Sequence, residues 1–448
     1  MTDAGHTRTP PDVLLALVLG GSFVAVAFLT AGGIDAAPNT WVEIVLTLVG
    51  AGACAAVLLA RRPGRLWGGA TLLLLVALAA LTYASIAWSV APDITWVEAN
   101  RTLSYLAVFG SGIALVRLAG DRWPALVAAV ALATIAICCY TLLAKAFPAS
   151  LAPNDTLGRL QLPFGYFNAT GLIAALGVVP CLWVGARRDG GVALRALSAP
   201  AIAILSTVLV LSYSRGAVLA AIIGVGCWFA LAPLRLRSAL MLALGVAGGA
   251  SAAAWALGHH AIVGDNVPLD ARTAAGHSFG LVLIVVLVVT TLAGIAGAIA
   301  MKRIRVPSST RRRVGVALVV LLALVPVGGL LAVAASSRGL TGEVSHLWTQ
   351  ATSGSVGNNP GRLAQLGSSR GNYWSVGVKV GEHALLAGVG ARGYATARPR
   401  YTPSLLETDA HSYVIETFAD FGLIGVALSL ALLVVWGIAT RRTLGGVG

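Results

Sequence analysis

The stretch ETDAHSYVIETFADFGLIGVALSLALLVVW, from Glu407 to Trp436, joins a polar segment to a continuous apolar run. Its first half mixes ionisable with apolar residues, and its second half is apolar enough to enter a membrane. Upstream lies a polar segment of roughly 75 residues, Ser336 to His411, far longer than an ordinary connection. Ionisable groups are costly to place next to the hydrocarbon core, so proteins keep them there mainly at functional sites. We therefore expect a functional site where this segment meets the last helix.

The composition predicts an all-α polytopic membrane protein. The chain is 57% hydrophobic and 11% charged, and its mean hydropathy is +0.85. A helix needs about 20 mostly apolar residues to cross the hydrocarbon core, and about twelve such windows are present. One long extracytoplasmic segment precedes the last of them. The predicted spans are approximately residues 13–33, 41–60, 66–89, 102–120, 123–147, 168–186, 198–214, 216–233, 238–258, 278–300, 314–335 and 413–438.

The distribution of Lys and Arg predicts the orientation. With a cytoplasmic N-terminus, 19 of the 31 basic residues fall in inner segments, and 7 of the remaining 12 lie in the long polar segment. Long loops cross the membrane regardless of their charge, so those seven do not count against this orientation. Both termini are therefore predicted to be cytoplasmic and the long segment extracytoplasmic. The chain divides into a membrane domain (1–335), an extracytoplasmic loop with amphipathic helices (336–412), and the last helix with a cytoplasmic tail (413–448).

The charge and the cysteines exclude two classes of protein. The net charge is +14, but the membrane topology already explains most of the basic residues, so we expect no nucleic-acid partner. All five cysteines fall inside predicted spans, which leaves no disulfide framework or zinc motif for the outer loop.

Three short polar motifs lie on the predicted outer side. An arginine at a helix end is costly unless it meets an anion, although a snorkelling arginine is the alternative reading. Residues 370–386 combine charged and apolar positions in a pattern that favours an interfacial helix over a strand. The motifs are Tyr213-Ser214-Arg215-Gly216, Arg370 with Trp374, and His411 with Glu416 and Asp420.

Together these motifs resemble the O-antigen ligase and polymerase family of membrane glycosyltransferases. Ser412 stands where that family usually has Asn, and Tyr166-Phe167-Asn168 replaces an Asn-Pro-Asn-like stretch. The residues that carry the resemblance are Ser214-Arg215-Gly216, Arg370 followed by Trp374, Leu386-Ala-Gly388-Val389-Gly390, Ala410-His411-Ser412-Tyr413 through Glu416, Phe421-Gly422-Leu-Ile-Gly425, and the segment from Arg159 to Ala169.

The residue types suit glycan transfer on chemical grounds as well. Cleavage of a sugar–pyrophosphate bond releases a strongly anionic group, and the planar fork of arginine binds phosphate oxygens in two places without a metal. We assign Arg215 and Arg370 to this clamp. His411 is the candidate general base, because a histidine pKa lies near the working pH. The other candidates for substrate binding are Arg159, Tyr213, Ser214, Trp374, Arg392, Arg398 and Arg400.

Three carboxylates are candidate supporting residues. Asp409 is a candidate N-cap, which would place His411 in the first turn of the last helix, where the helix dipole favours a neutral imidazole. Glu416 and Asp420 are four residues apart and share one helix face, either to orient the site or to form a structural ion pair. Glu407 and Asp409 also resemble the paired carboxylates of metal-dependent membrane glycosyltransferases. Few other outer acids are available, so we favour arginine clamping and expect neither a metal nor a cofactor.

The resemblance implies a GT-C-like enzyme in the bacterial cytoplasmic membrane with an extracytoplasmic active site. It implies inverting, metal-independent transfer of a glycan from undecaprenyl pyrophosphate to a hydroxyl of an acceptor glycan or glycolipid. Polymerisation onto another glycan and transfer to a protein hydroxyl use the same chemistry and stay open. A secondary transporter is the alternative of another class, but the chain has no repeated half and its long loop is late and outward.

Overall fold

The computed structural model describes most of the chain as helix. The described residues are 10–30, 36–60, 68–187, 191–231, 235–303, 360–363, 370–402 and 407–445, with Arg313, Val316, Val320, Gly342, Ser345, His346 and Thr349. Within them there is no β-strand. They form two compact units, which comprise Met1–Asn39, Arg122–Val344 and Gly357–Gln365 (unit 1), and Thr40–Asp121, Ser345–Val356 and Leu366–Gly448 (unit 2). The predicted three-part division by membrane topology stays a prediction.

Nine helices in the described part of the chain are long and apolar enough to cross a membrane. They agree with an all-helical, multi-pass membrane protein and with nine of the twelve predicted spans. The count of twelve and the GT-C-like arrangement stay predictions. The nine spans are Asp12–Leu29, Ala37–Leu59, Gly69–Ala87, Trp123–Ala146, Phe167–Ala186, Val192–Leu211, Leu236–Leu257, Leu269–Met301 and Tyr413–Arg442.

The other three predicted spans have different outcomes. The span at 102–120 lies within α4 (Pro92–Ala119), which carries charged residues in its first half and is not among the nine. The span at 216–233 is the shorter apolar helix α10 (Arg215–Leu231) of 17 residues. The span at 314–335 lies outside the described residues, apart from Val316 and Val320.

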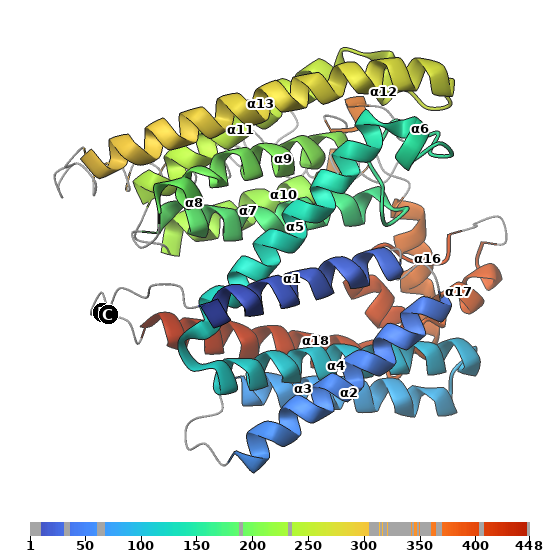
Figure 1. Cartoon of the computed structure of the whole chain (residues 1–448). Helices are drawn as coiled ribbons and strands as arrows, with labels where there is room; N and C mark the ends of the chain where they lie inside the picture. Colours follow the sequence, from blue (N-terminus) through green and yellow to red (C-terminus); the bar gives the residue numbers. More distant parts are fainter. Residues whose placement is uncertain are drawn as a thin grey trace. The chain divides into compact units, whose positions relative to one another are not determined.

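Unit 1 is a bundle in which α9 packs against α7 and α11, and α13 lies along α11 (Figure 1). Small residues let these helices approach closely, as apolar packing in lipid requires. A Cβ added to Gly245 of α11 would lie 2.5 Å from the Cβ of Ile202 on α9. The helices are α1 (Pro10–Leu29), α5 (Trp123–Ala146), α6 (Pro148–Leu151), α7 (Phe167–Ala186), α8 (Val192–Ala196), α9 (Ser198–Leu211), α10, α11 (Arg235–Leu257), α12 (His260–Val263), α13 (Leu269–Arg303) and the 3-10 turns η3 (Gly120–Arg122, of which only Arg122 belongs to unit 1) and η4 (Pro360–Leu363).

Unit 2 combines membrane helices with the segment that precedes the last of them. Helix α18 packs against α3 and α16, and α3 packs against α4. Val376, Val380, Tyr394 and Ala419 form its buried apolar cluster. The elements are α2 (Ala36–Leu59, which belongs to unit 2 from Thr40), α3 (Gly69–Ala84), η2 (Ser85–Ala87), α4, α16 (Arg370–His383), α17 (Tyr394–Ala397), η5 (Arg398–Arg400) and α18 (Tyr413–Gly445).

Helix α18 is interrupted at Gly422, whose φ of 60° and ψ of −153° are not helical. A loop from Leu385 to Gly390 supplies the backbone hydrogen bonds that the break leaves open. The N–H groups of Leu423 and Ile424 donate to the carbonyls of Leu385 and Leu386 at 2.9 and 3.1 Å. In return the N–H groups of Val389 and Gly390 donate to the carbonyls of Ala419 and Asp420 at 3.0 and 2.9 Å. The single helix predicted over 413–438 is therefore two helical segments joined through this loop.

Gly388 is the tightest point of this junction. It has a φ of +64°, and a Cβ there would lie 2.3 Å from the backbone carbon of Asp420. We expect Gly388→Ala to lower the free energy of unfolding by about 1–3 kcal/mol, because the side chain meets rigid backbone in a left-handed conformation. Thermal unfolding in detergent, followed by tryptophan fluorescence, measures the change. Gly437→Ala in α18, where an added Cβ would meet no atom within 4 Å, is the control. Equal midpoints for the two variants contradict this account of the junction.

Candidate active site

The predicted site residues fall into two sets, and each set lies within one unit. Unit 1 contains the set around Arg215, and unit 2 contains the set around His411. The first set is Arg159, Tyr213, Ser214 and Arg215, and the second is Arg370, Trp374, Arg392, Arg398, Arg400, Asp409, His411, Glu416 and Asp420.

In unit 1, Ser214 begins α10 and places Arg215 at the first helical position. The Ser214 hydroxyl accepts a hydrogen bond from the N–H of Ala217 at 3.4 Å, as an N-cap does, and donates to Oδ1 of Asn168 at 2.9 Å. Ser214 is buried, whereas Arg215 is partly exposed. The Ser-Arg-Gly motif is therefore a helix start, and Asn168 fixes its cap.

Arg159 holds the turn that precedes this helix start. Its side chain is only 1% exposed, and its guanidinium carbon lies 3.3 Å from the ring centre of Phe167. Nε and Nη2 donate to the carbonyl of Ser212 at 3.1 and 2.9 Å, and Nη2 also reaches the carbonyl of Tyr213 at 3.3 Å. Burial lowers the pKa of Arg159 to about 10, with a smaller contribution from Arg362, so it stays charged at neutral pH. This geometry favours a positioning role for Arg159 over direct contact with a substrate.

Tyr213 combines three unusual features. It is fully buried, its φ of 49° is left-handed, and its hydroxyl has no hydrogen-bond partner among the described residues. Burial raises the pKa of this phenol. Left-handed backbone is uncommon for a bulky residue and often marks a functional turn. The strained turn therefore lies directly before the candidate clamp residue Arg215.

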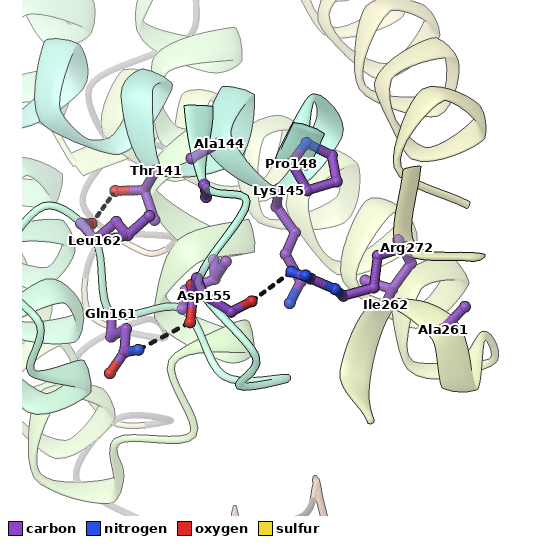
Figure 2. A pocket seen from close by; sticks show the side chains of 12 residues that line it. Thr141, Ala144, Lys145, Pro148, Asp155, Gln161, Leu162, Ala261, Ile262 and Arg272 are labelled. Carbon is purple, nitrogen blue, oxygen red and sulfur yellow. Dashed lines mark hydrogen bonds between the residues drawn. The ribbon is translucent and has the colours of Figure 1, made fainter. Parts of the chain in front are cut away.

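The loop that carries Arg159 is anchored beside a small cavity of about 20 Å³, whose lining combines apolar side chains with Lys145, Asp155 and Arg272 (Figure 2). Arg272 of α13 donates to the carbonyls of Asp155 and Pro153, the latter at 3.0 Å. Lys145 of α5 donates to the carbonyl of Leu157 at 3.1 Å. These contacts tie the loop to two membrane helices, so Arg159 is held in a fixed place.

In unit 2, Asp420 organises the loop that follows the α18 junction. Its side chain is 5% exposed, and its two carboxylate oxygens accept hydrogen bonds from the N–H groups of Arg392 at 2.8 Å and Tyr394 at 3.1 Å. The φ of Arg392 is +58°, a second left-handed residue in the candidate site. Two further side chains hold the same loop. Nε1 of Trp88 donates to the carbonyl of Ala387 at 3.1 Å, and the hydroxyl of Thr95 donates to the carbonyl of Ala391 at 2.8 Å.

His411 lies just before α18, not in its first turn. The helix begins at Tyr413, and the carbonyl of Ser412 accepts the N–H of Glu416 at 2.9 Å. The prediction that Asp409 is the N-cap was wrong, because Ser412 takes that position and the φ of His411 is +55°, outside the helical region. His411 is exposed, and its Nδ1 lies 3.1 Å from the carbonyl oxygen of Asp409. Since a carbonyl only accepts, Nδ1 is the donor in this contact, and in the neutral form of the ring the lone pair is therefore on Nε2.

The carboxylate of Asp409 connects His411 to the loop. Its Oδ1 pairs with Nη1 of Arg392 at 2.9 Å, and its Oδ2 accepts the hydroxyl of Thr408 at 3.0 Å. Glu416, in the first turn of α18, is near enough to Asp409 to interact with it electrostatically. Glu416 and Asp420 thus come from the same short stretch of helix but serve different neighbours.

Helix α16 confirms the helix predicted for residues 370–386 and brings Tyr373 to the site. Arg370 begins the helix, and Trp374 lies one turn later; both are partly exposed. The ring of Tyr373 lies 5.6 Å from the ring of His411, between their centroids. Burial raises the pKa of Tyr394 to about 12, so its hydroxyl stays protonated and donates to the carbonyl of Tyr373 at 3.3 Å.

Arg398 and Arg400 belong to the 3-10 turn η5. The guanidinium of Arg398 donates to the carbonyls of Ala395, at 3.4 Å, and Glu407. Arg400 is exposed. Of this pair, Arg398 binds backbone carbonyls near the site, whereas Arg400 is exposed.

Comparison with known protein families finds a match that covers part of the chain. Residues 271–430 match the family model described as O-antigen ligase. The matched region belongs to the O-antigen ligase family. It runs from α13 through most of α18 and contains the whole unit 2 set, whereas the Arg215 set lies before it. No curated protein and no solved structure matches the chain significantly. Members of the family are ligases or glycosyltransferases, so the match supports, in broad terms, an enzyme of the O-antigen ligase or polymerase type.

The metal alternative involves residues whose contacts are now defined. Asp409 of the O-antigen ligase domain is bound by Arg392, and Glu407 is exposed. In the part of the chain that the structure describes, no group of three or more His, Cys, Asp and Glu side chains is placed to hold a metal ion. One of the two candidate carboxylates is therefore committed to an arginine.

The sequence reasoning missed two residues that the structure connects to the site, and it named a third, Asn168, without a role. Tyr373 packs against His411, Trp88 supports the loop at Ala387, and Asn168 fixes Ser214. Tyr373 follows Arg370 by three positions, so the helix period of the predicted segment was a signal that could have found it. Trp88 and Ala387 are almost 300 residues apart in the chain, and no local pattern connects them.

Proposed function

We propose that the protein is an inverting, metal-independent glycosyltransferase of the GT-C-like membrane type. It moves a glycan from undecaprenyl pyrophosphate to a hydroxyl of an acceptor glycan or glycolipid at the outer face of the bacterial cytoplasmic membrane. Both of its termini lie in the cytoplasm. The observation that carries the proposal is the imidazole of His411, whose Nδ1 hydrogen bond to Asp409 leaves Nε2 as a base within the O-antigen ligase domain.

His411 removes the proton of the acceptor. Nε2 takes the proton of the attacking hydroxyl while the acceptor oxygen forms a bond to the anomeric carbon of the donor sugar. The bond between that carbon and the pyrophosphate oxygen breaks, and the pyrophosphate leaves with the electron pair. Because attack and departure occur on opposite faces of the sugar, the configuration inverts. No redox partner is needed, and the imidazolium later loses its proton to water.

Arg215 and Arg370 stabilise the leaving group. The donor pyrophosphate already carries two negative charges, and a third develops as it departs; the guanidinium fork stabilises this charge through paired hydrogen bonds. Each arginine begins a helix, α10 and α16 respectively, so the backbone at each position is fixed by the following helix. Fixed positive charge is worth more for the transition state than mobile charge, since no reorganisation is required.

Reconstitution tests this function. The purified full-length chain in proteoliposomes receives a polyprenyl-pyrophosphate-linked glycan and, separately, a lipid-anchored sugar core, a free glycan or a protein acceptor. We expect a covalent glycan–acceptor product, with release of polyprenyl pyrophosphate and inverted configuration by NMR. Movement of the glycan across the membrane without any covalent product would favour the transporter alternative and end the proposal.

Chelation tests the metal independence. We expect the transfer rate in excess EDTA to stay within about 2-fold of the untreated rate, because arginines rather than a cation neutralise the leaving group. Of the two carboxylates that could bind a metal, Glu407 is the one that does not pair with Arg392. Glu407→Gln should likewise leave the rate within about 2-fold. Loss of activity in EDTA that Mg²⁺ or Mn²⁺ restores would reverse the assignment.

A further inference from the structure

We infer that Arg392 is a positioning residue. Asp420 holds the backbone of Arg392, and the side chain of Arg392 fixes Asp409 and thereby the imidazole of His411. The inference rests on the proposed function, because it takes His411 as the general base. It removes Arg392 from the set of substrate-binding arginines. We call the three residues Asp420, Arg392 and Asp409 the latch.

The first link of the latch is between Asp420 and the backbone of Arg392. The carboxylate of Asp420 is nearly fully buried and places one oxygen on the N–H of Arg392 and the other on the N–H of Tyr394. A buried carboxylate without such donors would be costly, so these two hydrogen bonds hold the loop firmly. They also hold Arg392 in its left-handed conformation, which a residue with a side chain rarely adopts.

The second link is between the side chains of Arg392 and Asp409. Nη1 of Arg392 lies 2.9 Å from Oδ1 of Asp409, and the two side chains are 36% and 34% exposed. Solvent screens such a pair, so its value lies in geometry rather than in stability. It joins the loop after α16 to the segment before α18. The contact lies at Asp409, two residues before the catalytic histidine.

The third link is between Asp409 and His411. The carbonyl of Asp409 accepts the Nδ1 proton of His411, and the left-handed backbone of His411 turns the ring back toward that carbonyl. The ring of His411 also packs against the ring of Tyr373. If Asp409 loses Arg392, its peptide group is free to rotate, and both the ring orientation and the Nδ1 tautomer lose their support.

The latch depends on a rigid base, and the structure provides one. The loop that carries Arg392 is fixed at Gly388 by the α18 junction and at Ala391 by Thr95 of α4. Asp420 itself lies two residues before the break at Gly422. The break in α18 thus places the buried carboxylate and the loop backbone within hydrogen-bond distance.

A double-mutant cycle tests the latch in the full-length protein. Arg392→Asn keeps a residue type that tolerates a positive φ but loses the guanidinium, and Asp409→Ala removes its partner. We expect each single change to lower kcat by about 10-fold with KM for the donor within about 2-fold, because the base is misplaced while binding is intact. The double variant should fall no further than the worse single variant, and Arg392→Lys should recover part of the rate. Lys379→Asn, which removes an exposed cation from α16, is the control and should leave kcat unchanged.

Two kinetic results overturn the inference. A rise in KM at constant kcat would make Arg392 a substrate-binding residue after all. Losses that multiply to about 100-fold in the double variant would show that Arg392 and Asp409 act independently.

A spectroscopic readout separates failure of the latch from failure of the proposed function. In ¹⁵N-histidine NMR, with the His411 signal assigned by its loss in His411→Asn, the wild type should show the Nδ1-protonated tautomer. Arg392→Asn should show a mixture of tautomers, whether or not any glycan is transferred. An unchanged His411 signal in Arg392→Asn contradicts the latch, whereas a shifted signal in a protein without transferase activity contradicts only the proposed function.

Discussion

His411→Asn should abolish glycan transfer, lowering kcat by about 10²–10⁴-fold, because the acceptor hydroxyl loses its base. Asparagine is the informative replacement. The φ of His411 is +55°, and Asn tolerates that conformation whereas Ala is strained in it. The substitution therefore removes the imidazole with little effect on the backbone. Product formation from a lipid-linked donor, measured in proteoliposomes at saturating acceptor, gives the rate.

The matched control for His411 is His383→Asn at the exposed end of α16. It makes the same chemical change in the same unit and should leave the rate unchanged. Both variants should show the thermal unfolding midpoint of the wild type. A His411→Asn enzyme with more than about half the wild-type rate would remove the imidazole from the mechanism, and another base would have to be found.

Arg215→Ala and Arg370→Ala should each lower kcat by about 10²–10³-fold, since each removes a fixed positive charge from the departing pyrophosphate. Arg215→Lys and Arg370→Lys should recover only part of the rate, because lysine keeps the charge but lacks the planar fork that grips two oxygens at once. Rates at saturating donor separate this effect from ground-state binding.

Insertion and stability must be the same in these variants as in the wild type. Ser214 still caps α10 when Arg215 is changed, so the helix start should persist. Lys379→Ala, which removes an exposed cation from α16, is the matched loss of charge and should be silent. If saturating donor restores the full rate of either alanine variant, that arginine contributes uniform binding and is not part of the leaving-group clamp.

Much of the fold followed from the sequence because hydrophobic runs and helix length are local properties. Nine of the predicted spans coincide with apolar helices, and α16 was expected from the mixed pattern of residues 370–386. The family was recognisable from short motifs around Ser214, Gly388 and His411, and the matched region includes the latter two. These features depend on residues that are neighbours in the chain.

The details of the site did not follow from local patterns. Asp409 looked like an N-cap, yet Ser412 takes the N-cap position of α18, and Asp409, three residues further upstream, pairs with Arg392. Arg159 looked like a ligand for phosphate, yet its donors serve the carbonyls of Ser212 and Tyr213. The apolar pattern predicted one continuous last helix. No local feature shows that residues 385–390 hydrogen-bond to its backbone on both sides of the break at Gly422.

By itself the sequence determined the all-helical membrane character, the late polar segment and the identity of the candidate base and arginines. The length of an apolar run and the chemistry of a side chain can both be read directly from the sequence. Only the tertiary structure decided what each charged group does, because hydrogen bonds form between atoms that folding brings together. Asp420 reaches Arg392 across 28 positions, and Arg392 then reaches Asp409 next to His411. The break in helix α18 places the carboxylate of Asp420 next to the loop at Arg392, and this is why a carboxylate in a membrane helix supports a loop.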